Sequence, residues 1–149
     1  MRYQETGELH LDFHGATATT INYVVKHFGH GALRPLMTQM AKQVYRDIYT
    51  QLQAGNAEAL AEHWQYFFER EKGDFQVIRH CDGSIELRVR ECPAVRQLRA
   101  IGMDVSPDFC LQTKMINEAW SEGSPFTITT EKTGEASCLQ IIMVKEQKS

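Results

Sequence analysis

Apolar side chains recur at every third or fourth position over several stretches of the chain, which is the spacing that gathers them on one face of an α-helix. The first stretch contains Phe13, Thr17, Ile21, Val24 and Phe28. It predicts an amphipathic helix over residues 13–28, with Asp12 capping its start and Gly29 its end.

Four further helices are predicted from the same spacing and from glycine and proline at their ends. They are expected to run from about residue 31 to Gly55, from Asn56 to Gly73, from Pro93 to Gly102 and from Pro107 to about Glu122. The first of these has one continuous apolar stripe, formed by Leu36, Met40, Val44, Ile48 and Leu52. That stripe predicts an uninterrupted helix.

Two other regions alternate apolar and polar residues with a period of two, as half-buried strands do. Residues 75–80 and 85–90 alternate on either side of an Asp82-Gly83 turn, and residues 126–130 and 138–144 alternate on either side of Thr133-Gly134. Each pair predicts an antiparallel hairpin. We therefore expect an α+β fold, in which an antiparallel sheet of about four strands from two hairpins packs against about five helices.

Composition supports one globular domain over residues 1–149, because a chain of 149 residues has the length of a typical domain. Hydrophobic residues make up 42% and charged residues 23%, and the net charge is -3. This balance argues against nucleic acid as a partner, because phosphate binding needs an excess of lysine and arginine. It also argues against a polybasic membrane-surface protein.

Three observations bear on the compartment. No apolar run approaches the length that a membrane span needs, and residues 1–13 lack the apolar core of a signal peptide. The four cysteines are widely spaced and form no CxxC pair, so we expect reduced thiols. These observations predict a cytoplasmic protein. We further expect it to act on a small molecule, and the sequence is compatible with a homo-oligomer.

The strongest chemical signal is the position of two thiols. Cys92 directly precedes Pro93 at a helix start, and Cys110 follows Ser106-Pro107 in the first turn of the next helix. The N–H groups and partial positive charge of a helix N-terminus favour thiolate over thiol, so both cysteines are candidate nucleophiles. Burial as small apolar residues is the alternative. Cys138 is expected to pack in the core, and Cys81 lies beside a turn.

A candidate proton carrier lies on the first predicted helix. His14 shares a helix side with Thr17, and the two could line a pocket. Among several arginines near the first hairpin, Arg96 follows Cys92 by one helical turn and could hold a substrate carboxylate. No zinc-binding spacing and no P-loop, GxGxxG, GxSxG or HExxH motif occurs, so the cofactor is unspecified. A metal held by distant His and Cys residues stays an alternative.

The order of short motifs adds a resemblance. The stretch from Glu91 to Val95 with Leu98, Gly102, Phe109-Cys110 and Thr113, and the later Gly134 to Cys138, resembles the L-2-amino-thiazoline-4-carboxylic acid hydrolase-like family. His14 and Thr17, ahead of the segment Tyr45 to Tyr49, are similar to the family's N-terminal half. The resemblance covers most of the chain and implies hydrolytic opening of a cyclic amidine, the thiazoline ring, on a bacterial route to L-cysteine.

These lines of reasoning lead to two functional hypotheses. In the first, Cys110 or Cys92 attacks the ring carbon between nitrogen and sulfur, His14 exchanges the proton, and Arg96 holds the carboxylate, with Thr17 and Thr113 as further substrate contacts. A metal-activated water could replace the thiolate in this scheme. In the second hypothesis, the same pocket belongs to a non-catalytic domain that binds or senses a small molecule.

Overall fold

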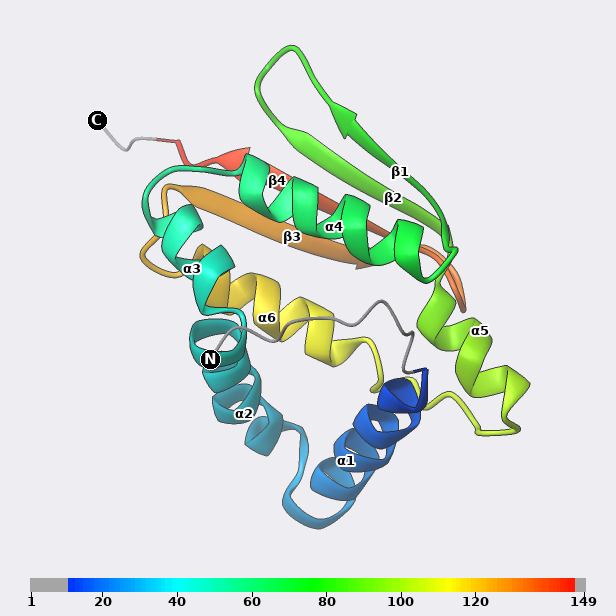
Figure 1. The fold of residues 1–149 in the computed structure, drawn as a ribbon. Coiled ribbons are helices and arrows are strands. Elements are labelled where there is room, and N and C mark those ends of the chain that lie inside the picture. The colour runs from blue at the N-terminus through cyan, green and yellow to red at the C-terminus, as the bar shows by residue number, and fades with distance from the viewer. Residues whose placement is uncertain (1–10, 147–149) are drawn as a thin grey trace.

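The computed structural model describes residues 11–146, in which helices pack on one face of a four-stranded antiparallel sheet (Figure 1). The helices are α1 (Asp12–Phe28), α2 (Leu33–Gln39), α3 (Arg46–Gln53), α4 (Glu58–Arg70), α5 (Pro93–Ala100) and α6 (Leu111–Ser121). The strands are β1 (Asp74–Arg79), β2 (Ile85–Glu91), β3 (Phe126–Lys132) and β4 (Cys138–Val144). The predicted α+β class and both predicted hairpins are confirmed.

The two hairpins lie side by side, which gives the strand order β1-β2-β4-β3. Residues directly opposite one another on neighbouring strands share a face of the sheet. Val89, Cys138 and Lys132 form one such row across β2, β4 and β3, and Leu87, Gln140 and Thr130 form the next row. Polar side chains therefore interrupt the apolar inner face, at the end of the sheet where β2 leads into α5.

Helices α4 and α6 cover this inner face, α4 over β1 and β2 and α6 over β3 (Figure 1). The core between them includes Leu60, Trp64 and Phe68 from α4, Ile116 and Trp120 from α6, and Leu87, Ile128 and Ile142 from the strands. Each of these side chains contributes about 1.5–3 kcal/mol through burial. This packing fixes the two helices as the walls of the site described below.

The helix predicted from about residue 31 to Gly55 is divided, and this is the main correction to the predicted fold. A π-helix at Met40–Val44 separates α2 from α3, and its last bond runs from the Tyr45 N–H to the Met40 carbonyl, 3.0 Å away. The wider turn shifts the register, because it contains more residues than an α-turn. Val44, expected in the apolar stripe, is 69% exposed, and Tyr45 turns inward in its place.

Both candidate thiols lie at helix starts, as predicted, but α6 begins later than expected. Cys92 is the N-cap of α5, and Pro93 is its first residue. After Ser106, residues 107–110 form a turn in which the Ser106 hydroxyl accepts the Asp108 N–H at 3.1 Å. Cys110 is consequently the N-cap of α6 and not a residue of its first turn.

Candidate functional site

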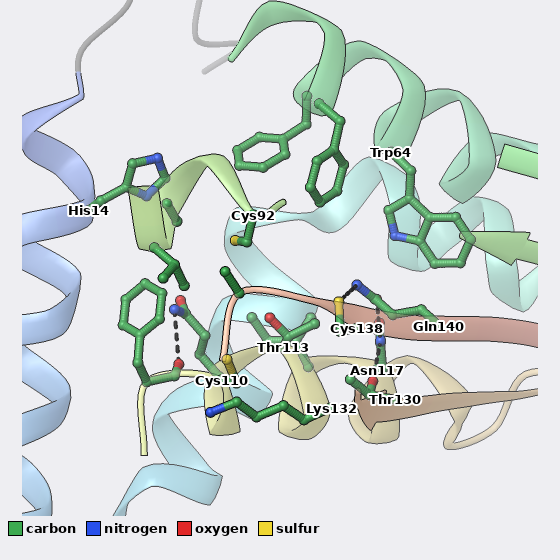
Figure 2. Close-up of a pocket in the computed structure, with 18 of the residues that line it drawn as sticks. His14, Trp64, Cys92, Cys110, Thr113, Asn117, Thr130, Lys132, Cys138 and Gln140 are labelled. Carbon is green, nitrogen blue, oxygen red and sulfur yellow. Dashed lines mark hydrogen bonds between the residues drawn. The ribbon is translucent and has the colours of Figure 1, made fainter. Parts of the chain in front are cut away.

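A cavity of about 190 Å³ lies among α4, α6, the start of α5 and the inner face of β3 and β4 (Figure 2). Its walls are largely apolar, and their aromatic members include Phe13, Tyr45, Trp64, Phe67, Phe109 and Trp120. An engineered cavity of about 150 Å³ in another protein accommodates benzene. This cavity therefore has room for one ring with a short substituent.

Three of the four cysteines face this cavity from different elements. Cys92 comes from the start of α5, Cys110 from the start of α6 and Cys138 from the start of β4 (Figure 2). The structure thus brings together the two thiols that the sequence singled out. It adds Cys138, whose position on the same strand face as Gln140 was the available signal, while Cys81 is exposed elsewhere.

Burial raises the pKa of all three cavity thiols. For Cys92, the N–H groups of Val95 and Ala94 at the start of α5 lower the pKa, but burial outweighs them. For Cys110, burial is opposed by the positive charge of Lys132. For Cys138, burial raises the pKa to about 11 despite a hydrogen bond with Gln140. Burial thus acts against the thiolate form predicted for Cys92 and Cys110, because desolvation disfavours the charged form.

A buried amide network forms the floor of the cavity. Asn117 is 1% exposed, and its Nδ2 donates to Thr130 Oγ1 at 2.8 Å and to Gln140 Oε1 at 2.7 Å. These bonds attach α6 to β3 and β4 (Figure 2). Sequence analysis missed this network, although an asparagine on the apolar face of a helix was a visible signal.

Thr113 lies one turn before Asn117 on α6 and lines the cavity, as predicted. Its hydroxyl makes no hydrogen bond to any residue in the described range 11–146, so it is free to contact a ligand. Thr17, by contrast, is half-buried on α1 and does not line the cavity. The predicted role of Thr17 in substrate binding therefore has no support in this geometry.

His14 lines the cavity and is held by a partner that the sequence did not reveal. It is 4% exposed, and its Nε2 lies 2.5 Å from Oε2 of Glu71, whose side chain is also largely buried. The pair joins α1 to the end of α4, 57 residues away in sequence. A carboxylate that fixes an imidazole in this way orients it, as in many sites where histidine moves a proton.

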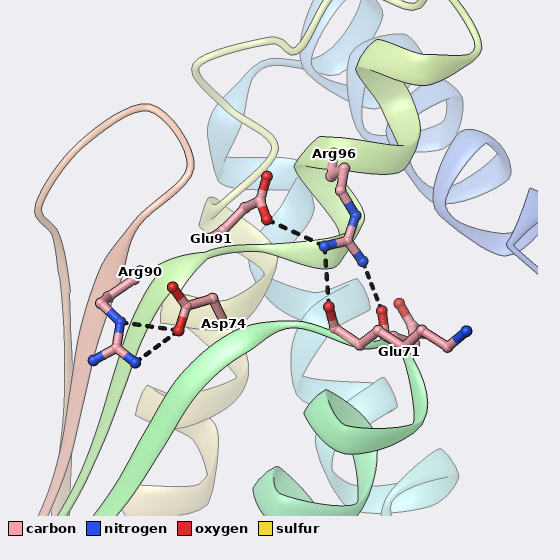
Figure 3. A network of polar contacts seen from close by, with 6 residues as sticks. Glu71, Asp74, Arg90, Glu91 and Arg96 are labelled. Carbon is pink, nitrogen blue, oxygen red and sulfur yellow. Dashed lines mark hydrogen bonds and ion pairs between the residues drawn. The ribbon is translucent and has the colours of Figure 1, made fainter.

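Arg96 is not part of the cavity wall, which corrects its predicted role. Its guanidinium donates to the main-chain carbonyls of Glu71 at 2.8 Å and Lys72 at 3.0 Å, and it pairs with Glu91 at 3.2 Å (Figure 3). Close by, Arg90 pairs with Asp74. Arg96 therefore secures the turn that carries Glu71, and through it supports His14.

Lys132, and not Arg96, is the basic residue that faces the cavity and could hold a ligand carboxylate. It is the only lysine or arginine on the cavity wall within residues 11–146, and it makes no ion pair or hydrogen bond with any of them. It stands directly opposite Cys138 on the inner face, and it is exposed at the rim near Cys110 (Figure 2). Glu135, the one carboxylate that residues 11–146 place on the wall, is paired with Arg99 at 2.7 Å.

No three His, Cys, Asp or Glu side chains between residues 11 and 146 are placed to hold a metal ion, and no helix there is long and apolar enough to cross a membrane. The cytoplasmic prediction rested partly on the lack of a signal-peptide core in residues 1–13. Residues 1–10 of that segment lie outside the described range. Comparison with family models, curated proteins and solved structures found no match.

Proposed function

We propose that this protein binds a small organic acid with a single ring in the aromatic cavity. The volume of about 190 Å³ suits one ring, and the aromatic walls supply apolar contact on several sides. The three cavity thiols are neutral at physiological pH, since burial raises the pKa of each. They therefore act in this proposal as soft, apolar parts of the wall.

The observation that carries the proposal is the ammonium group of Lys132, which has no ion-pair or hydrogen-bond partner among residues 11–146. The Glu135 carboxylate on the wall is already paired with Arg99, and the His14 ring is hydrogen-bonded to Glu71. A carboxylate entering the cavity would therefore find one charge available to it. An ion pair with an exposed lysine contributes about 0.2–1 kcal/mol in water, and this rises toward about 1.5–3 kcal/mol when the bound ligand excludes water from the bond.

Intrinsic fluorescence provides a direct test, because the chain has two tryptophans and both line the cavity. We expect titration with benzoate to change the emission of Trp64 and Trp120 and to saturate. Lys132→Met should weaken binding at least about tenfold, which corresponds to about 1.4 kcal/mol. Lys114→Met is the matched control, because Lys114 is exposed on α6 and does not line the cavity. Equal affinities for the two variants, or no saturable change, would contradict the proposal.

A second candidate function is the ring opening that the family resemblance implies. One observation favours it: Cys110 lies within the electrostatic reach of Lys132, in a cavity that also suits a thiazoline carboxylate. The Cys110 thiol would add to the amidine carbon while its proton passes through His14 to the ring nitrogen. The ring C–N bond would then break, and attack by water would release the opened product and restore the thiol.

The test of this second function is incubation with 2-amino-thiazoline-4-carboxylate, with and without added divalent metal, followed by mass spectrometry. Ring opening would yield a product heavier by one water molecule. Cys110→Ala should then abolish turnover, whereas Cys81→Ala should not, because Cys81 is exposed outside the cavity. Absence of product from the unmodified protein would remove the hydrolase and leave the binding function.

A further inference from the structure

Two further polar side chains on the cavity wall, besides Lys132 and Thr113, have no hydrogen-bond partner among residues 11–146. Tyr45 and His63 both line the cavity and are half-buried. Neither the Tyr45 hydroxyl nor the His63 ring nitrogens make a hydrogen bond to any residue between 11 and 146. Partly buried polar groups usually find a partner, so both are available to a bound molecule.

Aromatic contacts hold these two side chains in place. The Tyr45 ring meets the His63 ring edge-on with centroids 5.6 Å apart, and it meets the Trp120 ring in the same way at 5.7 Å. On its other side, His63 stacks on Phe67 at an interplanar angle of 27°. The Tyr45 hydroxyl and the His63 ring nitrogens are thus held in place without a hydrogen bond to residues 11–146, as in a preformed binding site.

The backbone before Tyr45 is a second, independent observation. Tyr45 ends the π-helix at Met40–Val44, and its own φ and ψ of -95° and 37° are not helical. A continuous helix with the predicted stripe would have turned Val44 inward, but Val44 is exposed and a phenol faces the cavity instead. Single π-turns within helices occur frequently at functional sites.

Lys132 and the pair line different parts of the cavity wall. Trp120, which contacts Tyr45, lies near the end of α6. The charge of Lys132 acts on Cys110, which is the N-cap of the same helix. The cavity therefore has a cationic end and a second, uncharged polar end, with aromatic walls between them.

We propose that Tyr45 and His63 bind a second polar group of the ligand, which is then a hydroxyl-bearing or carbonyl-bearing cyclic acid. This inference rests on the proposed binding function and narrows its ligand class. Burial raises the pKa of Tyr45 and lowers that of His63, so the phenol keeps its proton to donate and the neutral imidazole can donate or accept. A ligand hydroxyl could accept a hydrogen bond from the Tyr45 phenol and donate one to a ring nitrogen of His63.

The test compares benzoate with 3- and 4-hydroxybenzoate by calorimetric titration. The unmodified protein should bind at least one hydroxybenzoate about fivefold to tenfold more tightly than benzoate, as expected for one or two added hydrogen bonds. In Tyr45→Phe, and separately in His63→Phe, this ratio should fall toward one. Tyr23→Phe should keep the ratio, because Tyr23 is exposed on α1 and does not line the cavity.

The outcomes separate this inference from the proposed function. If benzoate binds and hydroxylation brings no gain in the unmodified protein, the inference is overturned and the binding function stands. If both variants weaken all three ligands equally and preserve the ratio, Tyr45 and His63 have only a structural role and the inference again fails. If none of the three acids binds, the proposed function and the inference fail together.

Discussion

The four cysteines differ in the burial of their sulfur atoms, and alkylation rates should report this difference. The Cys138 thiol has its pKa raised to about 11 by burial. The ordinary pKa value on the same scale is 9.0, so at neutral pH the thiolate fraction of Cys138 is lower by roughly 100-fold. Because the thiolate is the reactive form, iodoacetamide should modify Cys138 at least that much more slowly than an ordinary exposed thiol.

The assay is peptide-level mass spectrometry of the native protein after timed exposure to iodoacetamide over a range of pH. Cys81 is exposed and provides an internal reference in the same sample. We expect Cys81 to react first and Cys138 last, with Cys92 and Cys110 between them because burial also raises the pKa of these two thiols. In denaturant, all four should react at similar rates.

The pH dependence decides between a neutral thiol and an activated nucleophile. The rate at Cys138 should rise about tenfold per pH unit through pH 9 without levelling off, since its thiolate remains the minor form over that range. A rate at Cys92 or Cys110 that exceeds that of Cys81 at neutral pH, or that levels off below about pH 8, would refute this reasoning. It would restore the thiolate nucleophile predicted from the helix starts.

Three predictions concern stability. Asn117→Ala removes two hydrogen bonds of the amide network and leaves the Gln140 amide oxygen without a donor. The free energy of unfolding, measured by urea denaturation, should therefore fall by about 2–4 kcal/mol. A loss below about 0.5 kcal/mol would show that the network is dispensable. Glu71→Gln weakens the charge-assisted bond to His14 and should cost about 1–3 kcal/mol by the same measurement, and an unchanged midpoint would contradict this. Burial lowers the pKa of His63, so the unfolded chain binds its proton more readily and stability should fall as pH drops below about 6.5; His63→Phe should flatten that decline, and an identical profile would exclude this cause.

Much of the fold follows from local signals that the sequence displays. The Asp82-Gly83 turn with alternation on both sides specified the first hairpin, and Gly83 adopts a φ of 84°, a conformation that glycine allows without strain. Pro93 marked the start of α5, so the N-cap position of Cys92 was predictable. These features depend on residues within a few positions of one another.

The parts that could not be predicted depend on tertiary packing. The apolar stripe from Leu36 to Leu52 is compatible with a continuous helix, and only the packing of Tyr45 against Trp120 and His63 distinguishes the π-turn. Lys132 lies beyond the strand predicted over residues 126–130, and only the observed strand register places it opposite Cys138. For Arg96 the error was the opposite one. Its position one helical turn after Cys92 suggested substrate binding, but its guanidinium binds the main chain of the turn at Glu71.

The central claim is that Lys132 receives a carboxylate inside the aromatic cavity, and a charge comparison tests it most directly. Benzoate and benzamide have nearly the same shape and differ in charge, so calorimetric titration of both isolates the electrostatic contribution. The unmodified protein should bind benzoate at least about tenfold more tightly than benzamide, and Lys132→Met should abolish that preference. Equal affinity for the two compounds in the unmodified protein, or a preference that survives in Lys132→Met, would contradict the claim.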